Sequence, residues 1–289
     1  MAPAMPHVDG VEHAYADAGG LRMHYAEAGD PSADVLLCVH GWPENWWAWR
    51  NLIPPLAERF RVIAPDLRGL GWSDAPPDGY DKRQLALDVV ALMDALGIER
   101  ARWLGHDWGA FAGWHAMTEF PQRLERFMPL SIPHPWVPEG PPDLRRLASA
   151  WYQVVLAAPV LGRLAVGPIG FPGKILRRSR KAGEWTDDEV HFYEDLLRRP
   201  GYRDASIQYY RTFVLRELVA LARGQFRDRR LTVPTRLVVG RSDPVAAGMS
   251  DDYRDHADDM EIVYVDGAAH WLPEEKPDTV LELALGFLP

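Results

Sequence analysis

The chain has 289 residues, 47% of them apolar, and a formal charge of −9. This length and apolar content exclude a disordered chain and indicate a globular protein with a sizeable core. The negative charge argues against a nucleic-acid or anionic-membrane partner, because either normally requires a basic surface. We therefore expect a small, uncharged binding partner.

The first 20 residues lack the basic start and apolar centre of a secretion signal. No stretch approaches the roughly 20 apolar residues that cross a bilayer. We expect a cytoplasmic location. The one cysteine, Cys38, lies in an apolar run, so we expect a buried small hydrophobe and no intrachain disulfide.

Predicted strands alternate with predicted helices along much of the chain. Residues 11–28 predict a hairpin around Gly19-Gly20. Short apolar runs then predict strands at 35–40, 60–66, 101–107, 126–131, 235–240 and 261–267. Such alternation is typical of a parallel sheet covered on both faces by helices. The clearest helix is 81–96, with Asp81 as its N-cap and Gly97 at its end.

Strand signals are missing between about residues 134 and 224. Helices are predicted there near 143–165, 186–199 and 203–223. This pattern predicts a helical cap, 134–224, inserted into a core domain formed by 1–133 and 225–289. We interpret the basic run 177–181 as a solvated helix end and the acidic stretch 251–259 as a solvated helical face.

A candidate nucleophile lies in GHDWG, residues 105–109, between a predicted strand and a helix over 110–119. A G-x-nucleophile-x-G turn holds its central residue strained at the tip of a strand, and the glycines let neighbouring backbones pass. The central residue is Asp107. A carboxylate that attacks saturated carbon leaves an ester, which water can cleave, whereas serine would leave an ether. The alternative is a helix-capping aspartate.

Two further candidates follow the nucleophile in the chain. Asp243 and His270 each come just after a predicted strand, where the loops of an open α/β sheet form sites. A carboxylate that holds one imidazole nitrogen leaves the other to take a proton from water. Asp66 and Asp74 are alternatives for the acid, but they precede the nucleophile.

The backbone amides of Trp42 and Trp108 are the predicted oxyanion-hole donors. Trp42 follows the strand 35–40, and Trp108 follows the nucleophile. Both amides can point at the tetrahedral intermediate of ester hydrolysis, where the loss of one donor typically costs about 2.7–4 kcal/mol. The indole rings could equally serve as pocket wall or core.

Four blocks resemble the α/β-hydrolase epoxide hydrolases: HGWPENWWAWR at 40–50, GLGWS at 69–73, GHDWG at 105–109 and GAAHW at 267–271. The resemblance spans nearly the whole chain. It implies an α/β-hydrolase fold with a mostly parallel eight-stranded sheet, helices on both faces and a helical cap. It further implies that an epoxide and water give a vicinal diol through a covalent aspartyl ester. The sequence offers no metal-ligand spacing and no Gly-rich phosphate loop, so we expect no cofactor or metal.

The same resemblance implies that two cap tyrosines bind and protonate the epoxide oxygen. Tyr152 and Tyr210 match these positions, although Tyr209 is an open alternative to Tyr210. There is an independent chemical reason for such a pair, because opening an epoxide develops an alkoxide that two phenols can stabilise and protonate.

Two other functions stay open. The indoles of Trp42 and Trp108 could hold a halide, and a tryptophan directly after the aspartate also occurs in haloalkane dehalogenases. The arginines expected beside the nucleophile of a fluoroacetate dehalogenase are missing from this chain. A catalytically silent receptor on the same fold would be expected to lose some of these residues. The sequence leaves open the particular epoxide, the selectivity and the oligomeric state.

Overall fold

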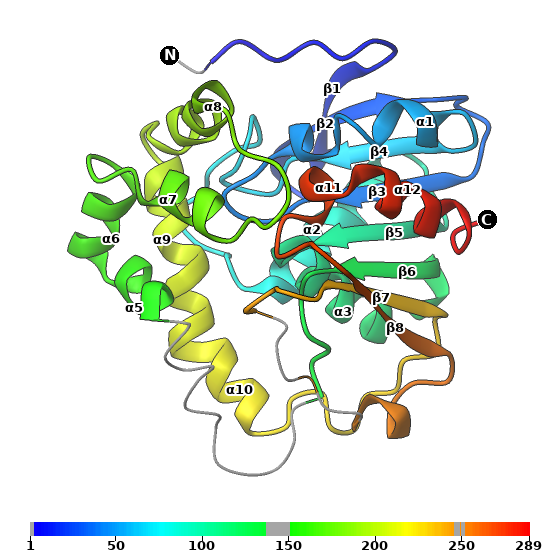
Figure 1. Ribbon diagram of the computed structural model, residues 1–289. Helices are drawn as coiled ribbons and strands as arrows, with labels where there is room; N and C mark the ends of the chain where they lie inside the picture. Colours follow the sequence, from blue (N-terminus) through cyan, green and yellow to red (C-terminus); the bar gives the residue numbers. More distant parts are fainter. Residues whose placement is uncertain (1–2, 137–150, 246–248, 250–251) are drawn as a thin grey trace.

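The computed structural model describes residues 3–136, 151–245, 249 and 252–289. Its centre is one sheet of eight strands in the order β1-β2-β4-β3-β5-β6-β7-β8 (Figure 1). The strands are β1 Glu12–Ala18, β2 Leu21–Ala28, β3 Val35–Val39, β4 Arg61–Pro65, β5 Ala101–His106, β6 Leu124–Leu130, β7 Thr235–Gly240 and β8 Met260–Val265. Strands β1, β2 and β4 pair antiparallel, and all other neighbours pair parallel. The predicted mostly parallel eight-stranded sheet is confirmed.

Helices cover both faces of this sheet. Helices α1 Ile53–Ala57, α11 Leu272–Glu275 and α12 Pro277–Leu285 lie in front of it in Figure 1, and α2 Lys82–Ala95 and α3 Trp108–Glu119 lie behind it. Successive side chains of a strand point to opposite faces of the sheet, so they pack into two different hydrophobic cores, one under each layer of helices. Leu36 packs with α1 and α12, while Leu37 packs with α2 and α3. Cys38 is fully buried, as expected, and burial raises the pKa of its thiol.

Helix α2 follows its sequence pattern closely. The Asp81 side chain accepts a hydrogen bond of 3.0 Å from the amide of Gln84, which caps the first turn. Leu85 and Val89 on the apolar face are fully buried. Gly97 ends the helix with a φ of 68°, a conformation that glycine adopts without a Cβ clash.

In the described part of the segment between β6 and β7, residues 151–222 are mainly helical, and we call them the helical insertion. It contains α5 Trp151–Ala157, α6 Pro159–Val166, α7 Phe171–Arg178, α8 Asp187–Leu197, α9 Tyr202–Thr212, the π-helical turn η3 Phe213–Glu217 and α10 Leu218–Ala222. These helices lie beyond the carboxyl ends of the strands (Figure 1). No helix in the described part of the chain is long and apolar enough to cross a membrane.

Two details of the insertion differ from the prediction. The helix predicted over 143–165 is interrupted at Ala158, which is extended because Pro159 follows it. Residues 143–150 of that prediction lie outside the described residues. Helix α7 was not predicted, because the sequence around it is short and rich in glycine and proline.

The basic run 177–181 is more than a solvated helix end. Arg177 donates to the backbone oxygen of Trp185 at 3.0 Å, and the guanidinium carbon of Arg180 lies 4.6 Å from the centroid of the Trp185 ring. Arg180 also donates to the backbone oxygen of Glu274 at 3.3 Å. The run therefore joins the insertion to α11.

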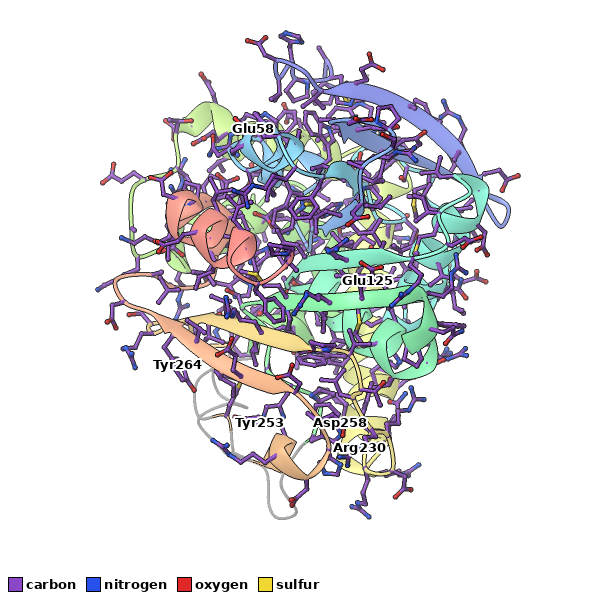
Figure 2. All side chains as sticks on the ribbon, turned by 90° about the vertical axis from the view of Figure 1, so that its right-hand side faces the viewer. Glu58, Glu125, Arg230, Tyr253, Asp258 and Tyr264 are labelled. Carbon is purple, nitrogen blue, oxygen red and sulfur yellow. The ribbon has the colours of Figure 1, made fainter. Side chains whose placement is uncertain are left out.

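The acidic stretch 251–259 does not form the predicted helical face. Only the 3₁₀ turn η4, Asp252–Asp255, is helical, and β8 begins at Met260. Residue 251 lies outside the described residues. Arg230 donates to the Asp258 carboxylate at 2.6 Å, and Figure 2 shows the two side chains next to each other below β8. A partner from another segment, rather than helical periodicity, thus orders this part of the chain.

Candidate active site

Asp107 lies at the turn between β5 and α3 with a φ of 48°, a region that side chains other than glycine rarely adopt. Two glycines make room for it. A Cβ on Gly41 would lie 2.4 Å from Asp107 Oδ2, and a Cβ on Gly109 would lie 2.2 Å from the backbone oxygen of Val39. The Asp107 amide donates to the backbone oxygen of Leu130 at 3.2 Å. The surrounding backbone therefore holds the strained conformation in place.

The Asp107 carboxylate does not cap α3, since it makes no capping hydrogen bond. Its Oδ2 instead accepts a hydrogen bond of 3.0 Å from the amide of Trp42. Burial raises the pKa of Asp107, and the rise is opposed by His270, by His106 and by the backbone amides of Trp108 and Trp42. The amides of both predicted oxyanion donors thus interact with this carboxylate.

His270 lies between two carboxylates. Its Nδ1 is 3.1 Å from Asp243 Oδ2, and its Nε2 is 3.7 Å from Asp107 Oδ1. The first distance is a hydrogen bond and the second is too long for one. Burial acts to lower the pKa of His270, but the charge and hydrogen bond of Asp243 and the charge of Asp107 outweigh it and raise that pKa to about 9. The structure therefore brings Asp107, His270 and Asp243 together.

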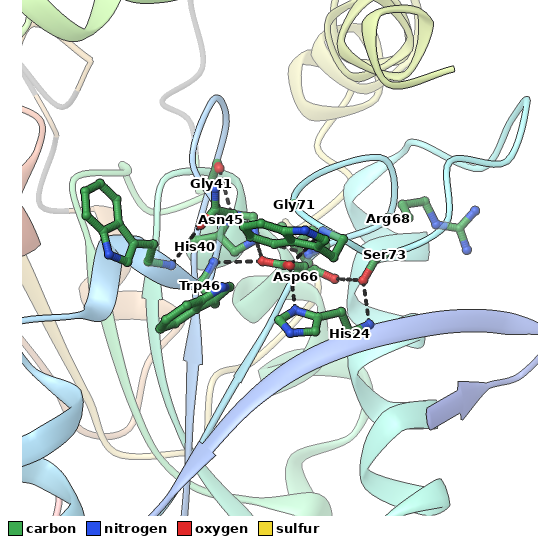
Figure 3. A network of polar contacts seen from close by, with 12 residues as sticks. His24, His40, Gly41, Asn45, Trp46, Asp66, Arg68, Gly71 and Ser73 are labelled. Atoms are coloured by element: carbon green, nitrogen blue, oxygen red, sulfur yellow. Dashed lines mark hydrogen bonds and ion pairs between the residues drawn. The ribbon is translucent and has the colours of Figure 1, made fainter. Parts of the chain in front are cut away.

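Asp66 and Asp74, the competing carboxylates, lie in different surroundings from Asp243. Asp66 accepts hydrogen bonds from His24 Nδ1 at 2.7 Å and from the amides of Trp46 at 2.8 Å and Trp72 at 2.9 Å. Figure 3 shows this buried network around Asp66. Asp74 is exposed. Of the three candidate acids, Asp243 is the one hydrogen-bonded to His270.

Glu275 supports the loop that carries His270, and sequence reasoning missed it. Its Oε1 accepts from the amide of Trp271 at 2.9 Å, and its Oε2 accepts from the amides of Lys181 at 2.7 Å and Ala182 at 2.9 Å. The amide of Ala269 also donates to this carboxylate, at 3.1 Å. One buried carboxylate thus holds both sides of the histidine loop and the loop between α7 and α8 of the helical insertion.

The backbone of His270 itself is held at both ends. Its amide donates to the backbone oxygen of Ser179 in the insertion at 3.1 Å, and its own oxygen accepts from His106 Nε2 at 2.8 Å. The other ring nitrogen of His106 is 2.8 Å from Glu44 Oε2. The position of the imidazole therefore depends on contacts with the insertion and with the residue before Asp107.

Tyr210 lies among the aromatic residues of the site. Its ring centroid is 5.1 Å from that of Trp42, 5.8 Å from that of Trp108 and 6.1 Å from that of Tyr152. Tyr209 faces the other way, and its hydroxyl donates to the backbone oxygen of Arg68 at 2.9 Å. Of the two neighbouring tyrosines, Tyr210 is therefore the one on the side of Asp107.

Both site tyrosines keep their protons at neutral pH. Burial raises the pKa of Tyr152 to about 12. Burial, together with the nearby Tyr152 and Asp107, raises the pKa of Tyr210 well above its ordinary value. Two phenols that stay neutral beside a carboxylate can act as hydrogen-bond donors and as acids.

The two indoles differ in what their N–H groups do. Trp42 Nε1 donates to the hydroxyl of Ser206 in α9 at 3.0 Å. Trp108 Nε1 is buried and forms no hydrogen bond within the described residues. The indole N–H groups of Trp42 and Trp108 are therefore not both free to bind one anion.

Known proteins share this architecture. The model of the alpha/beta hydrolase fold family matches residues 34–277. The AB hydrolase superfamily protein YfhM of Bacillus subtilis is 30% identical over 97% of this chain and 99% of its own length. The soluble epoxide hydrolase of Corynebacterium sp. is 30% identical over 96% of this chain and 97% of its own length. The crystal structure of epoxide hydrolase VrEH1 from Vigna radiata is 28% identical with a TM-score of 0.82, covering 98% of this chain and 99% of that one.

The chain belongs to the α/β-hydrolase fold family, and it is a hydrolase. The resemblance to the epoxide hydrolases that the sequence motifs indicated is confirmed.

Proposed function

We propose that this enzyme is an epoxide hydrolase that converts a small apolar epoxide and water to a vicinal diol through an ester on Asp107. The observation that carries the proposal is the position of Asp107. Its carboxylate lies 3.7 Å from His270 Nε2 and accepts a hydrogen bond from the Trp42 amide. The neutral phenol of Tyr210 lies beside the indoles of Trp42 and Trp108, and the phenol of Tyr152 lies beside that of Tyr210.

In the first step, Asp107 Oδ1 attacks an epoxide carbon while Oδ2 stays hydrogen-bonded to the Trp42 amide. The carbon–oxygen bond of the ring breaks, and the oxygen becomes an alkoxide. Tyr152 and Tyr210 bind this oxygen, and one of them transfers its proton. A phenol with a pKa of about 12 is a strong enough acid for this, since water has a pKa of about 15.7.

In the second step, His270 Nε2 takes a proton from water, and the resulting hydroxide attacks Cγ of the ester. The amides of Trp42 and Trp108 stabilise the oxyanion of the tetrahedral intermediate. The bond from Cγ to the former Asp107 Oδ1 then breaks, and the departing alkoxide takes the proton of the new carboxyl group, which leaves the diol and the Asp107 carboxylate. The proton held by His270 returns through solvent to the tyrosinate formed in the first step, so both phenols are again neutral. Alkylation prepares His270 for this step. The charge of Asp107 helps to keep His270 protonated, and the ester carries no such charge.

A haloalkane dehalogenase would use the same nucleophile, and in this chain the indole N–H groups of Trp42 and Trp108 are the donors that could hold the halide. Trp108 offers one, whereas the N–H of Trp42 is already donated to Ser206. A silent receptor would not need Asp107, His270 and Asp243 within reach of each other. Both observations support the epoxide.

The first test is a panel of racemic epoxides and haloalkanes assayed for diol and for halide. We expect diol from epoxides and little halide. Single turnover in ¹⁸O-water should then give unlabelled product and label in Asp107. Label that appears in the product at the first turnover would mean direct attack by water and would end the two-step proposal.

The second test removes each phenol while keeping its ring. Tyr152→Phe and Tyr210→Phe should each slow ester formation by roughly 10²–10⁴, the usual worth of a general acid. Tyr209→Phe is the matched control and should leave this rate nearly unchanged, since its hydroxyl binds Arg68 instead. If the tyrosine variants release halide at the parent rate while Trp108→Phe loses it, the enzyme is a dehalogenase.

A further inference from the structure

Lys82 is a charged residue in the core. It opens α2 behind the nucleophile turn, and none of its surface is exposed. A fully buried lysine is rare unless it is paired, because desolvation disfavours the charge. The steps proposed above do not use this residue, so its presence needs another explanation.

The ammonium group has partners for each of its three N–H donors. Nζ donates to the backbone oxygen of Tyr209 at 2.7 Å and to Glu217 Oε2 at 2.9 Å. It also lies 4.2 Å from the ring centroid of Trp108, within the range of a cation–π contact. Lys82 therefore touches the residue before Tyr210 and the residue after Asp107.

Glu217 completes this arrangement from the insertion. It is the last residue of the π-helical turn η3, and its Oε1 accepts from the amide of Lys82 at 2.8 Å. π-helical turns are rare and frequently occur at functional sites. Both oxygens of Glu217 thus bind Lys82, which joins the start of α2 to the end of α9 and η3.

A buried ion pair is weak evidence for stability, because apolar residues of similar volume often serve as well or better. The contacts of this pair suggest positioning instead. The Tyr209 oxygen belongs to the rigid peptide plane that leads into Tyr210, so holding that oxygen holds the start of Tyr210. The Trp108 ring contacts both Lys82 and Tyr210, and it is edge to face with the tyrosine at 71°.

We propose that Lys82, anchored by Glu217, is a positioning residue that sets the placement of Tyr210 and Trp108 in the site. This proposal rests on the proposed function, since it assigns Lys82 to the placement of one of the two acids. Tyr152 comes from α5, and its ring meets this arrangement through the Tyr210 ring, at a centroid distance of 6.1 Å, rather than through the Lys82 ammonium.

The test is a double-mutant cycle on the rate of ester formation. Lys82→Met with Glu217→Gln removes the charges together and leaves no unpaired buried ion. We expect this change to slow ester formation roughly tenfold to a hundredfold, because a misplacement of about 1 Å can cost that much. In a Tyr210→Phe background, Lys82→Met with Glu217→Gln should cause almost no additional loss in the rate of ester formation. In a Tyr152→Phe background, the same double change should cause its full loss.

The matched control is the ion pair Arg102–Glu125, which joins β5 to β6 at 2.9 Å. Glu125 lies at the amino end of its strand, on the side of the sheet away from the insertion (Figure 2). Arg102→Met with Glu125→Gln should not change ester formation. If the Lys82 pair gives equal losses in both tyrosine backgrounds, its role is only structural and the proposal is wrong. If the pair does not fold, Glu217→Gln alone is taken through the same cycle.

A second readout does not require epoxide activity. 3-Fluorotyrosine at position 210 gives a ¹⁹F signal, which should shift and broaden in the Lys82→Met, Glu217→Gln variant and stay unchanged in the control pair. An unchanged signal would overturn the proposal even in an active enzyme. If the parent enzyme forms no diol while the signal moves, the proposed function fails and the positioning role of Lys82 stands.

Discussion

The charge of Asp107 should control the pH at which His270 becomes a base. His270 Nε2 lies 3.7 Å from Asp107 Oδ1. Burial acts to lower the pKa of His270, but the charges of Asp243 and Asp107 outweigh it and raise this pKa to about 9. Unit charges at this distance interact by about 4.5 kcal/mol at an effective dielectric constant of 20 and by about 1.1 kcal/mol at that of water. One pH unit corresponds to about 1.36 kcal/mol. When Asp107 is converted to a neutral ester, the titration midpoint of His270 should therefore fall by roughly one to three pH units.

The sign of the effect is set by the role of His270. A base works only when it is neutral, so the rate of ester hydrolysis should rise with pH and level off above the midpoint. Stopped-flow measurements of ester formation and hydrolysis at a series of pH values give the midpoint in the ester. NMR titration of the His270 ring gives the midpoint in the free enzyme, which we expect near 9.

Equal midpoints in the two measurements would refute this coupling between Asp107 and His270. A hydrolysis rate that falls as pH rises would refute the role of His270 as the base. His270→Gln is the control, since it should retain the ester as an increase of one substrate mass in the intact protein.

Three further changes test other parts of the site. Asp107→Asn should abolish turnover, and it should raise the free energy of unfolding near neutral pH because burial disfavours the charge of Asp107. Thermal melts should show that this gain in stability shrinks as the pH falls through the raised pKa of Asp107. A gain in stability that does not depend on pH would contradict this reasoning. Glu275→Gln should slow ester hydrolysis more than ester formation in single-turnover assays, because it loosens the loop of the base, and an equal effect on both steps would argue against that role. Asp243→Asn should slow hydrolysis by up to about 10⁴, as for the aspartate of a serine-protease triad, and retention of the parent rate would mean that another carboxylate orients the ring.

Sequence patterns predicted the parts of this protein that depend on local chemistry. Short apolar runs become strands because a sheet buried on both faces needs them. The nucleophile turn was recognisable because the glycines two residues either side of the strained Asp107 leave no room for a Cβ, as the contacts of Gly105 and Gly109 show. The order of Asp107, Asp243 and His270 along the chain indicated the triad arrangement, because strand ends of a parallel sheet meet at one edge.

Side-chain direction in the helical insertion had to come from the tertiary structure. Neighbouring residues on a helix point about 100° apart, so adjacent tyrosines are equivalent until the helix is packed. The packing of α9 directs Tyr209 to the backbone of Arg68 and Tyr210 to the indoles. The same packing gives the N–H of Trp42 a partner in Ser206, which no motif indicated.

The polar contacts that support the site were also invisible in the sequence. Lys82 and Glu217 are 135 residues apart, and Glu275 is 94 residues from Lys181. The side chains of Lys82, Glu217 and Glu275 each look like an ordinary surface charge in their own segment. Only when the insertion folds back onto the core do they become buried and paired, because long-range contacts are created by the fold and leave no local pattern.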